Sequence, residues 1–501
     1  MAESFAELRA AAIDGRTHNI YYRQHQLEAL HTALINHASE IKDAIAADYG
    51  HSPAEVAVEI HLALSALKQS YETLQPVKAH ADEYLLASGS DAPNAKIPAG
   101  IAYIEPCTHT LFFSVVAPLS AAIAAGSCAI VLVSADLDPL DQKDIADKDI
   151  NQLENNLRTL TRVLRDTLKT ALHPDTFAIA SSPIRDTAIL NTAVHIDQNS
   201  SEHFAKANEL ASPSRSRTFA VVDRTSDIKT AARELVAARF AFGGSSPYAP
   251  DLVLVNEFVK QDFLQAVVDE SRKLSTSARI YGDAKGKPSG TKSLITALEA
   301  LKKADSNLHT ITQDSNAVIL ELPTRSPALL RLKTDAPILA VHTIKSLDDA
   351  IDFLSSSADE AGPALGAYHF GTPQVGKYLA QFVDARVSFV NHIPRDLLVG
   401  PALPVAAIPS STATARYTVD MFTLPRPAFI NPSSTSSEIA TLLSSSSAAN
   451  SSAAQKVLEK ALEPLKAMKR RPGGGVGKLF PTLSPCPSSS FHPPLWKGTF
   501  D

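Results

Sequence analysis

The sequence predicts an α/β protein built from two parallel-sheet domains in tandem. Its 501 residues exceed the usual size of a single hydrophobic core. Strand-like apolar runs alternate with helical runs in two successive units, which is typical of parallel strands joined by crossover helices. The 45% hydrophobic and 20% charged fractions suit a soluble globular chain with a large buried core.

The overall charge and the cysteines narrow the classes of function. A formal net charge of -6 and a pI near 6.2 give no electrostatic reason to expect nucleic acid, which needs a basic face. Cys107, Cys128 and Cys486 are widely spaced and form no CxxC pair, which favours a reducing compartment. The N-terminus, MAESFAELRAAAIDGR, has acids and arginines where a secretory signal needs an apolar run. We therefore expect a cytoplasmic protein.

The first part of the chain predicts helices, then extended segments. Apolar residues follow helical spacing over residues 27–45 and 56–74. Residues 79–98 alternate turn residues with extended runs, as a hairpin or an outlying sheet does. Leu111 to Ala135 carries no charge over a length that could cross a bilayer. Pro118 and Gly126 divide it, and it ends in AIVLV. We expect a buried helix and then a buried parallel strand, because such strands are apolar on both faces, and no membrane span.

Two alternating units follow. The first contains the strand AIVLV, a charged helix around 151–172, and the strands FAIA and AVHID. The second begins with a helix from Ile228 to Phe240, the strand DLVLVNEF and a helix from Val259 to Leu274. It continues with extended runs at AVILEL, around 337–344 and at RVSFVN. This order predicts the two parallel sheets.

From Asn431 the composition changes abruptly to serine and alanine, which predicts a flexible, disordered C-terminal tail with a short helix at 456–469. The run KRRPGGGVGKLF has the outline of a phosphate loop. Pro472 stands where the first glycine belongs, Leu479 replaces the hydroxyl residue that binds magnesium, and no strand precedes it. We interpret it as a basic tail.

Several motifs in order resemble the NAD(P)-dependent aldehyde dehydrogenase superfamily, in particular its shorter, fatty-aldehyde-type branch. The resemblance covers roughly residues 15–430 and is carried by RQHQLEAL, IPAGIAYIEPCTHTLFF, APLSAAIAAGSCAIVLVS, FAFGGSSPYAPDLVLV, TDAPILAVHTIKSLDDAIDFL and RVSFVNHI. It implies two tandem Rossmann-type domains and a small oligomerisation sheet. The implied boundaries are 1–78 for the N-terminal helices, 79–98 for an oligomerisation hairpin, 99–226 for the cofactor-type domain, 227–412 for the catalytic-type domain, 413–430 for a closing segment and 431–501 for the tail.

The family oxidises an aldehyde through a cysteine thiolate, an oxyanion-binding asparagine and a glutamate base. Its nucleophile loop, G-Q-x-C-x-A-P-D, matches 244–251 with A-P-D intact, and the cysteine position is Pro247. Neither Cys107 nor Cys128 takes that place by register. The asparagine position is Thr108, which lacks the reach of an amide.

The family's L-E-L-G-G-K motif supplies the glutamate. Counting back without gaps places Pro213 at the glutamate and Arg215 and Ser216 at the glycines. Glu209 is the nearest acid, and its use requires a four-residue insertion between two otherwise well-spaced elements. This register remains the alternative.

The positions that hold the cofactor in the family also differ. Leu132 stands at the lysine that reaches the adenosine ribose, Ala135 at the following glutamate, and Gln198 in the region of the helix-start glycine. Lys333 corresponds to the family's ribose-binding glutamate, and the late glycine-rich motif matches residues 404–412, which keep only a proline and Ser411. We expect no cofactor, because these replacements leave NAD(P) only weak support, and no metal.

The residues favour a degenerate, noncatalytic relative, a pseudoenzyme with a partner-binding or accessory role. By resemblance it forms a homodimer or a heteromer with a related protein, and the low-complexity tail suggests fungal specialised metabolism. One alternative is altered chemistry, either an atypical NAD(P)-dependent oxidoreductase or an esterase-like enzyme using Ser245 or Ser246 with His109 as base. The alternative is a purely structural role, in which the serines cap a turn and His109 is a partly buried packing residue. A misregistered, active aldehyde dehydrogenase is the third hypothesis, against which the A-P-D match argues.

Overall fold

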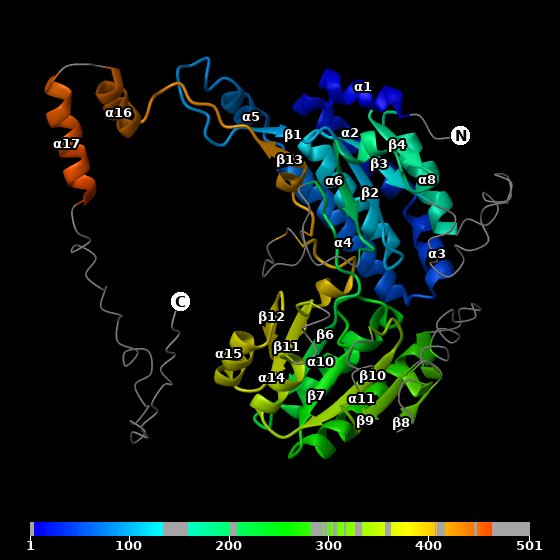
Figure 1. Cartoon of the computed structure of the whole chain (residues 1–501). Coiled ribbons are helices and arrows are strands. Elements are labelled where there is room, and N and C mark those ends of the chain that lie inside the picture. Colours follow the sequence, from blue (N-terminus) through cyan, green and yellow to red (C-terminus); the bar gives the residue numbers. More distant parts are fainter. Residues whose placement is uncertain are drawn as a thin grey trace. The chain divides into compact units, whose positions relative to one another are not determined.

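The computed structural model describes residues 5–133, 159–200, 208–281, 294, 298–299, 301–303, 308–314, 317–325, 333–355, 362–405, 407, 416–444 and 448–462. The chain forms two compact units, Met1–Ala428 and Phe429–Asp501. The first contains both predicted sheets (Figure 1). Ala135, Ser411, Cys486 and the glycine-rich run near 473 lie outside the described residues.

The N-terminal helices begin and end where local sequence signals require it. They are α1 (Ala6–Asp14), η1 (Arg16–His18), α2 (Ile20–Asn36), α3 (Ala38–Tyr49), α4 (Pro53–Glu72) and α5 (Pro76–Glu83). The Asn19 side chain caps α2, and Ser52 with Glu55 forms a capping box at the start of α4. The predicted stripes are buried on these helices, although residues 27–45 span two helices because the chain breaks at His37.

The cofactor-type sheet is four-stranded and parallel throughout. Its order is β4 (Phe177–Ala180), β3 (Cys128–Leu132), β2 (Ile101–Glu105) and β5 (Ala193–Asp197). The accompanying helices are α6 (Leu111–Ala125), α8 (Thr159–Ala171) and α9 (Thr187–Leu190). The apolar stretch from Leu111 is therefore a buried helix followed by a buried strand, as predicted. Among the described residues, no helix is both long and apolar enough to serve as a membrane span.

Pro118 lies inside α6 and does not divide it, contrary to the sequence prediction. Only Gly126, with φ of 90°, ends the helix. Proline has no N–H to donate to the carbonyl four residues earlier, which is that of Ser114. The Gln198 amide takes this role, because its Nε2 donates to the Ser114 oxygen at 2.8 Å. A side chain from the end of β5 thus completes the backbone hydrogen bonding of α6.

The catalytic-type sheet has seven strands. Its order is β12 (Ser388–Val390), β11 (Gly366–Phe370), β6 (Thr218–Val222), β7 (Leu252–Asn256), β10 (Ile338–Ile344), β9 (Val318–Leu322) and β8 (His309–Gln313). Only the β8–β9 pair is antiparallel. Among the described helices are α10 (Ile228–Phe240), α11 (Lys260–Tyr281), α14 (Leu347–Ser355) and α15 (Pro373–Phe382). The tandem α/β prediction is confirmed (Figure 1).

A third, two-stranded sheet pairs distant parts of the chain. Strand β1 (Lys96–Pro98) runs antiparallel to β13 (Thr423–Pro425), next to η5 (Val419–Phe422). Residues 79–98 were expected to form a hairpin or an outlying sheet. They begin within α5, and their strand β1 forms no hairpin but pairs with the closing segment in an outlying sheet. No local turn signal in the sequence could predict this pairing, because it joins residues more than three hundred positions apart.

The second unit contains α16 (Ser434–Ser444) and α17 (Ala448–Leu462). The serine-rich run at 434–444, predicted to be a flexible linker, is helical, and the helix predicted at 456–469 begins earlier, at Ala448. Alanine and leucine favour a helix strongly enough to offset the serines, whose penalty there is only a few tenths of a kcal/mol, about 0.5 at most, each. Residues 463–501 lie outside the described part of the chain.

Candidate functional site

A tight turn carries Ser245 from the end of α10 toward β7. It forms η3 (Ala241–Gly244), in which Phe242 has φ of 51°, Gly243 of 62° and Gly244 of 74°. A Cβ on Gly244 would lie 2.6 Å from the Ala336 backbone, so only glycine fits there. The turn passes close to the start of β10 and fixes the place of the serine that follows.

The structure brings two of the three predicted chemical residues together. The Oγ of Ser245 lies 2.9 Å from Nδ1 of His109, and Nε2 of the same ring lies 2.8 Å from the carbonyl oxygen of Leu398. A carbonyl only accepts, so Nε2 carries the proton and Nδ1 is the acceptor facing Ser245. Ser246 is elsewhere: it is 1% exposed, and its Oγ accepts the backbone N–H of Tyr248. The turn-capping interpretation therefore holds for Ser246.

Burial controls the charge of the imidazole. The His109 residue is 8% exposed, and desolvation, which outweighs the hydrogen bond to Leu398, lowers its pKa to about 3. The charges of His51, Arg416 and Lys333 act in the same direction. Near neutral pH the ring is therefore neutral, with Nδ1 unprotonated.

Arg416 holds the loop that orients His109. Its guanidinium donates to the carbonyl oxygens of Leu397, at 2.6 Å, and of Pro401. The Oγ1 of Thr110 accepts the Gly400 N–H at 2.7 Å. Sequence reasoning missed these residues. The signal in the chain was weak, because a buried arginine bound only to carbonyls leaves no charge pattern to find.

Pro247, expected at the family's nucleophile position, is buried and held by its carbonyl. That oxygen accepts from Lys333 Nζ at 2.6 Å and from Thr218 Oγ1 at 3.0 Å. Proline has neither a nucleophilic atom nor a backbone N–H that could stabilise an oxyanion. Lys333 also pairs with Asp251 at 2.9 Å, so this predicted cofactor position points into the turn.

Asp251 is the anchor of this region. It is 5% exposed, accepts the backbone N–H of Thr218 at 2.9 Å, and lies 3.5 Å from the fully buried guanidinium of Arg239. With Lys333, two cations and two or more backbone donors surround one carboxylate. Such a network of charges and backbone hydrogen bonds stabilises the turn.

The loop after β2 carries Cys107, which is buried, and Thr108, which is half-buried. The Cys107 side chain is buried, its Sγ lies 3.2 Å from the His109 carbonyl and 3.2 Å from Ser114 Oγ, and burial raises its pKa to about 11. Burial likewise raises the pKa of Cys128 to about 11. Neither thiol is therefore an ionised nucleophile at neutral pH. Thr108, expected at the oxyanion position, is half-buried between Cys107 and His109.

The residues at two of the predicted cofactor positions are packed into the protein. Gln198 is 0% exposed, with its Oε1 accepting the Cys107 N–H at 3.0 Å and its Nε2 bound to Ser114. Leu132 is 5% exposed and packs in an apolar cluster with Tyr103 and Ile130. A phosphate needs close backbone approach and free N–H donors. Neither the Gln198 side chain nor the aliphatic Leu132 side chain offers a charged group for a phosphate or a ribose.

The two glutamate registers lead to different places. Pro213 is buried in a turn in which its carbonyl accepts the Ser216 N–H at 3.1 Å. The backbone of Glu209 forms an isolated parallel β-bridge with His195 on β5. The ring of His195 lies 3.5 Å from the Glu105 carboxylate. Burial alone would lower the pKa of His195, but the hydrogen bond and charge of Glu105 raise it.

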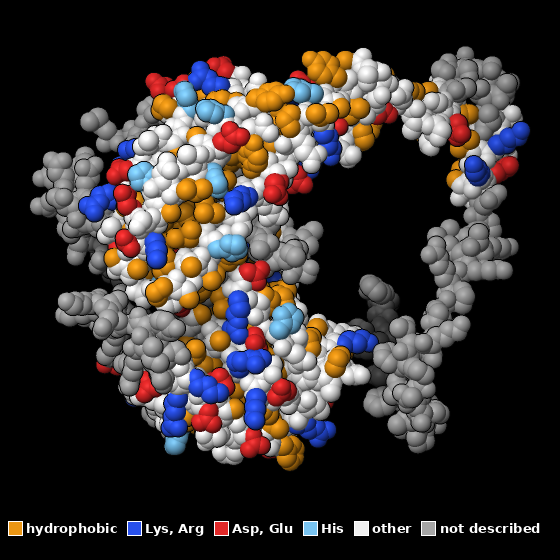
Figure 2. Space-filling view, turned by 180° about the vertical axis from the view of Figure 1, so that it is seen from behind, with side chains coloured by type: hydrophobic (Ala, Val, Ile, Leu, Met, Phe, Trp, Pro, Cys, Tyr) orange, Lys and Arg blue, Asp and Glu red, His pale blue; other side chains and the backbone are white. Residues whose placement is uncertain are grey.

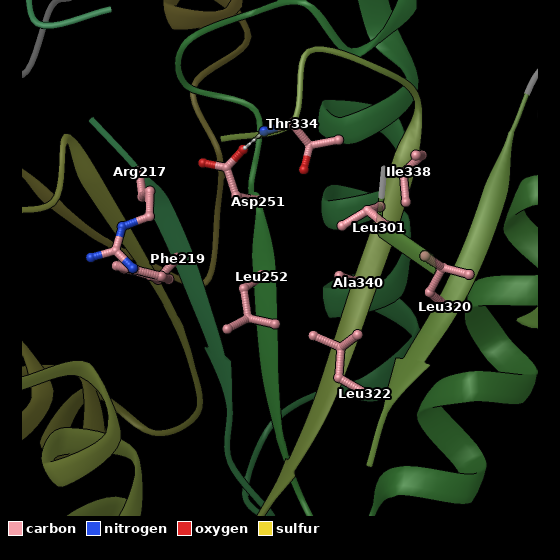
Figure 3. A pocket seen from close by; sticks show the side chains of 10 residues that line it. All are labelled: Arg217, Phe219, Asp251, Leu252, Leu301, Leu320, Leu322, Thr334, Ile338 and Ala340. Atoms are coloured by element: carbon pink, nitrogen blue, oxygen red, sulfur yellow. Dashed lines mark hydrogen bonds between the residues drawn. The ribbon is translucent and has the colours of Figure 1, made fainter. Parts of the chain in front are cut away.

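An open hollow lies on the seven-stranded sheet, near the start of its strands. It is narrow, with room inside for little more than a water molecule. Figure 3 shows its lining side chains, which are Arg217, Phe219, Asp251, Leu252, Leu301, Leu320, Leu322, Thr334, Ile338 and Ala340. Arg217 stacks over the Phe219 ring, and Asp251 accepts the Thr334 N–H. The walls are mostly aliphatic, and this hollow offers no nucleophile.

A buried acid and base face each other behind the turn. Glu59 is 0% exposed, and its Oε1 accepts the N–H groups of Phe112 and Phe113 at the start of α6. Its Oε2 lies 4.0 Å from Nδ1 of His51, and neither atom has a hydrogen-bond partner among the described residues. Burial raises the pKa of Glu59 to about 7 and lowers that of His51. The His51 ring meets the edge of Phe242 at 5.2 Å, next to the turn.

The site thus lies in a chain with two helix-flanked sheets in tandem, and this arrangement can be compared with known proteins. The chain is 25% identical over 439 residues to 4,4'-diaponeurosporen-aldehyde dehydrogenase of Staphylococcus aureus, covering 84% of this chain and 92% of that protein. It is 24% identical to aldehyde dehydrogenase family 3 member A2 of Mus musculus, covering 86% and 88% respectively. No family model matches the chain.

Solved structures agree on the fold. A substrate-bound Staphylococcus aureus AldH aligns with a TM-score of 0.62 at 19% identity, covering 86% of this chain and 94% of that one. An NADP-dependent glyceraldehyde-3-phosphate dehydrogenase from Bacillus halodurans, complexed with NADP, aligns with a TM-score of 0.62 at 12% identity, covering 85% and 90%. Over most of its length the chain is similar to aldehyde dehydrogenases, family 3 members among them, and it shares their fold.

Proposed function

We propose that this member of the superfamily does not oxidise aldehydes through a thiol and serves as a binding or accessory protein. The observation that carries the proposal is Pro247 within a loop that keeps the family's A-P-D sequence. Its carbonyl accepts from Lys333 and Thr218, which fixes the backbone of the turn at this position. A thiohemiacetal has no atom there on which to form.

The two thiols in the described part of the chain support the same conclusion. Cys107 and Cys128 are free and buried, and both have pKa values raised to about 11. A thiolate is the reactive form, and burial in apolar surroundings suppresses it. The free thiols also agree with a reducing, cytoplasmic location.

We further propose that the cofactor site is degenerate. Gln198 and Leu132 are packed into the core, and Lys333 is committed to Asp251. Homologous structures carry NADP, but in this chain the corresponding residues do not fit it. We therefore assign no reaction step to a nicotinamide.

The outlying sheet is the proposed pairing surface, for a homodimer or a heteromer with a related chain. Large apolar side chains are exposed around β1, β13 and α5, namely Val77 at 86%, Tyr84 at 63%, Leu86 at 40% and Leu424 at 51%. Figure 2 shows apolar side chains gathered on the upper part of one face, while charges of both signs are interspersed below. Exposed apolar clusters of this kind mark protein interaction sites. A mixed surface gives no support to nucleic-acid binding.

The proposal is tested by incubating the purified chain with medium- and long-chain aldehydes and either NAD+ or NADP+, and by following the reduced cofactor. We expect no turnover above a blank without protein. A melting-temperature shift with either cofactor checks binding separately. Aldehyde-dependent reduction that disappears in Cys107→Ser would overturn the proposal, because it would identify a working thiol. Size-exclusion chromatography of wild type against Leu424→Asp tests the pairing surface.

A further inference from the structure

We propose that Ser245 is a nucleophile that accepts acyl groups from esters, with His109 as its base. This activity is independent of the proposed function, because it needs neither a thiol nor a nicotinamide. The observation is the continuous arrangement of Ser245 Oγ, the His109 ring and the Leu398 carbonyl, at 2.9 Å and 2.8 Å.

The arrangement satisfies the geometric requirement for an activated serine. A hydroxyl lies within hydrogen-bond reach of an imidazole nitrogen, and a third group fixes the tautomer through the other nitrogen. Leu398 supplies a neutral carbonyl where hydrolases use a carboxylate. The loop that carries it is fixed by Arg416 and by Thr110. The third group is therefore rigid but uncharged.

Ser245 is also the more accessible serine of the pair. It is half-buried and follows Gly243, which is exposed, whereas Ser246 is 1% exposed and committed to the Tyr248 N–H. The Ser245 hydroxyl lies 2.8 Å from the Phe242 carbonyl as well, so its single proton has two acceptors. Rotation of one hydroxyl hydrogen toward Nδ1 gives the reactive arrangement.

The proposed step balances without any further reactant. Ser245 Oγ attacks the ester carbonyl carbon and forms a C–O bond, while its proton passes to Nδ1 of His109. The ester C–O bond breaks, and the leaving alkoxide or phenolate takes that proton from Nδ1. Water then attacks the acyl-serine, His109 accepts its proton, and the carboxylic acid leaves as Ser245 regains a hydrogen. The net reaction is ester hydrolysis.

The surroundings of His109 set the substrate class. Its imidazolium form is disfavoured by burial and by His51, Arg416 and Lys333, and its pKa is lowered to about 3. A base this weak removes a serine proton slowly, because general-base efficiency falls as the pKa moves away from the working pH. We therefore assign the site to activated esters with good leaving groups, and expect acylation to be slow and deacylation slower.

The test uses p-nitrophenyl acetate with the full chain. We expect a burst of p-nitrophenolate approaching one equivalent per chain, and an acetyl group on the peptide containing Ser245 by mass spectrometry. Ser245→Ala lowers the burst by about tenfold or more, since it removes the nucleophile. Ser246→Ala is the matched control and leaves the burst unchanged. Both variants are compared by melting temperature.

Equal bursts from wild type and Ser245→Ala, or acetylation confined to other residues, would overturn the proposal. His109→Gln keeps a donor for Leu398 but removes the base, and is expected to lower the burst as Ser245→Ala does. If His109→Gln does not fold, Ser245→Cys replaces it: its thiol is expected to react with iodoacetamide in the native protein. A native Ser245→Cys chain that resists alkylation at that position shows a closed site and refutes the proposal.

Discussion

Replacing Glu59 with glutamine should change the pH dependence of stability in a defined way. The carboxyl group is fully buried, and its pKa rises from 4.5 to about 7 mainly because burial disfavours the charged form. Glutamine keeps the oxygen that accepts the N–H groups of Phe112 and Phe113. It also places an N–H donor where Oε2 faces His51. The variant therefore removes the titration and keeps the cap of α6.

The sign and size follow from linkage. A carboxyl whose folded pKa is raised holds its proton more tightly in the folded state, so its contribution is fully present below pH 4.5 and is lost as pH rises through about 7. Each pKa unit corresponds to about 1.4 kcal/mol. The change from 4.5 to about 7 gives a loss of about 3 kcal/mol. The unfolding free energy of Glu59→Gln minus that of wild type should therefore be more positive above neutrality than at acid pH.

The assay is urea unfolding followed by circular dichroism, at pH values from about 4.5 to about 8. The quantity of interest is the difference in unfolding free energy between variant and wild type, which removes the titration of all other groups. Glu72→Gln, at the exposed end of the same helix, is the matched control and should show no such trend. A Glu59→Gln difference that stays constant over this range would refute a protonated Glu59 at neutral pH.

Three further outcomes follow from buried groups. Asp251→Ala should lower the unfolding free energy by about 3 to 5 kcal/mol, because it leaves two cations without their carboxylate, and a retained urea midpoint would contradict this. His369 is 0% exposed with neither ring nitrogen bonded among the described residues, and burial lowers its pKa from 6.5 to about 4. Stability should therefore fall as pH drops through this interval, and His369→Phe should flatten that fall in melting temperature. Native alkylation with iodoacetamide should leave Cys107 and Cys128 unmodified, and peptide mapping that finds either one labelled rapidly would contradict their burial.

The sequence predicted the parts of the fold that periodicity determines. Helix α10 has the bounds that its pattern predicted, and the uncharged stretch from Leu111 separates into helix and strand. The pairing of β1 with β13 was not predictable in this way, because it depends on a contact between distant segments and not on a local pattern. The helices at 434–462 were missed because composition was given more weight than helix propensity.

The sequence predicted which residues belong to the candidate site, but not the hydrogen bonds that join them. Ser245 and His109 were both named from motif positions, and the structure joins them. Ser246 could not be separated from Ser245 by sequence, because adjacent residues in a turn point in different directions. Arg416 could not be found, since its partners are backbone carbonyls that carry no sequence signal. The chemical roles of these residues remain predictions for the experiments above.

The proline in α6 makes the Gln198 side chain a part of the hydrogen bonding of that helix. Removing the amide of Gln198, for example by Gln198→Gly, would strip the Ser114 carbonyl of its donor, at a cost of about 1 to 3 kcal/mol for a bare buried acceptor. Pro118→Ala restores an intrahelical N–H for that oxygen. The two substitutions together should therefore be tolerated better than Gln198→Gly alone. Making room for a nucleotide by removing the Gln198 side chain thus also requires replacing Pro118, so that the helix supplies the missing N–H donor itself.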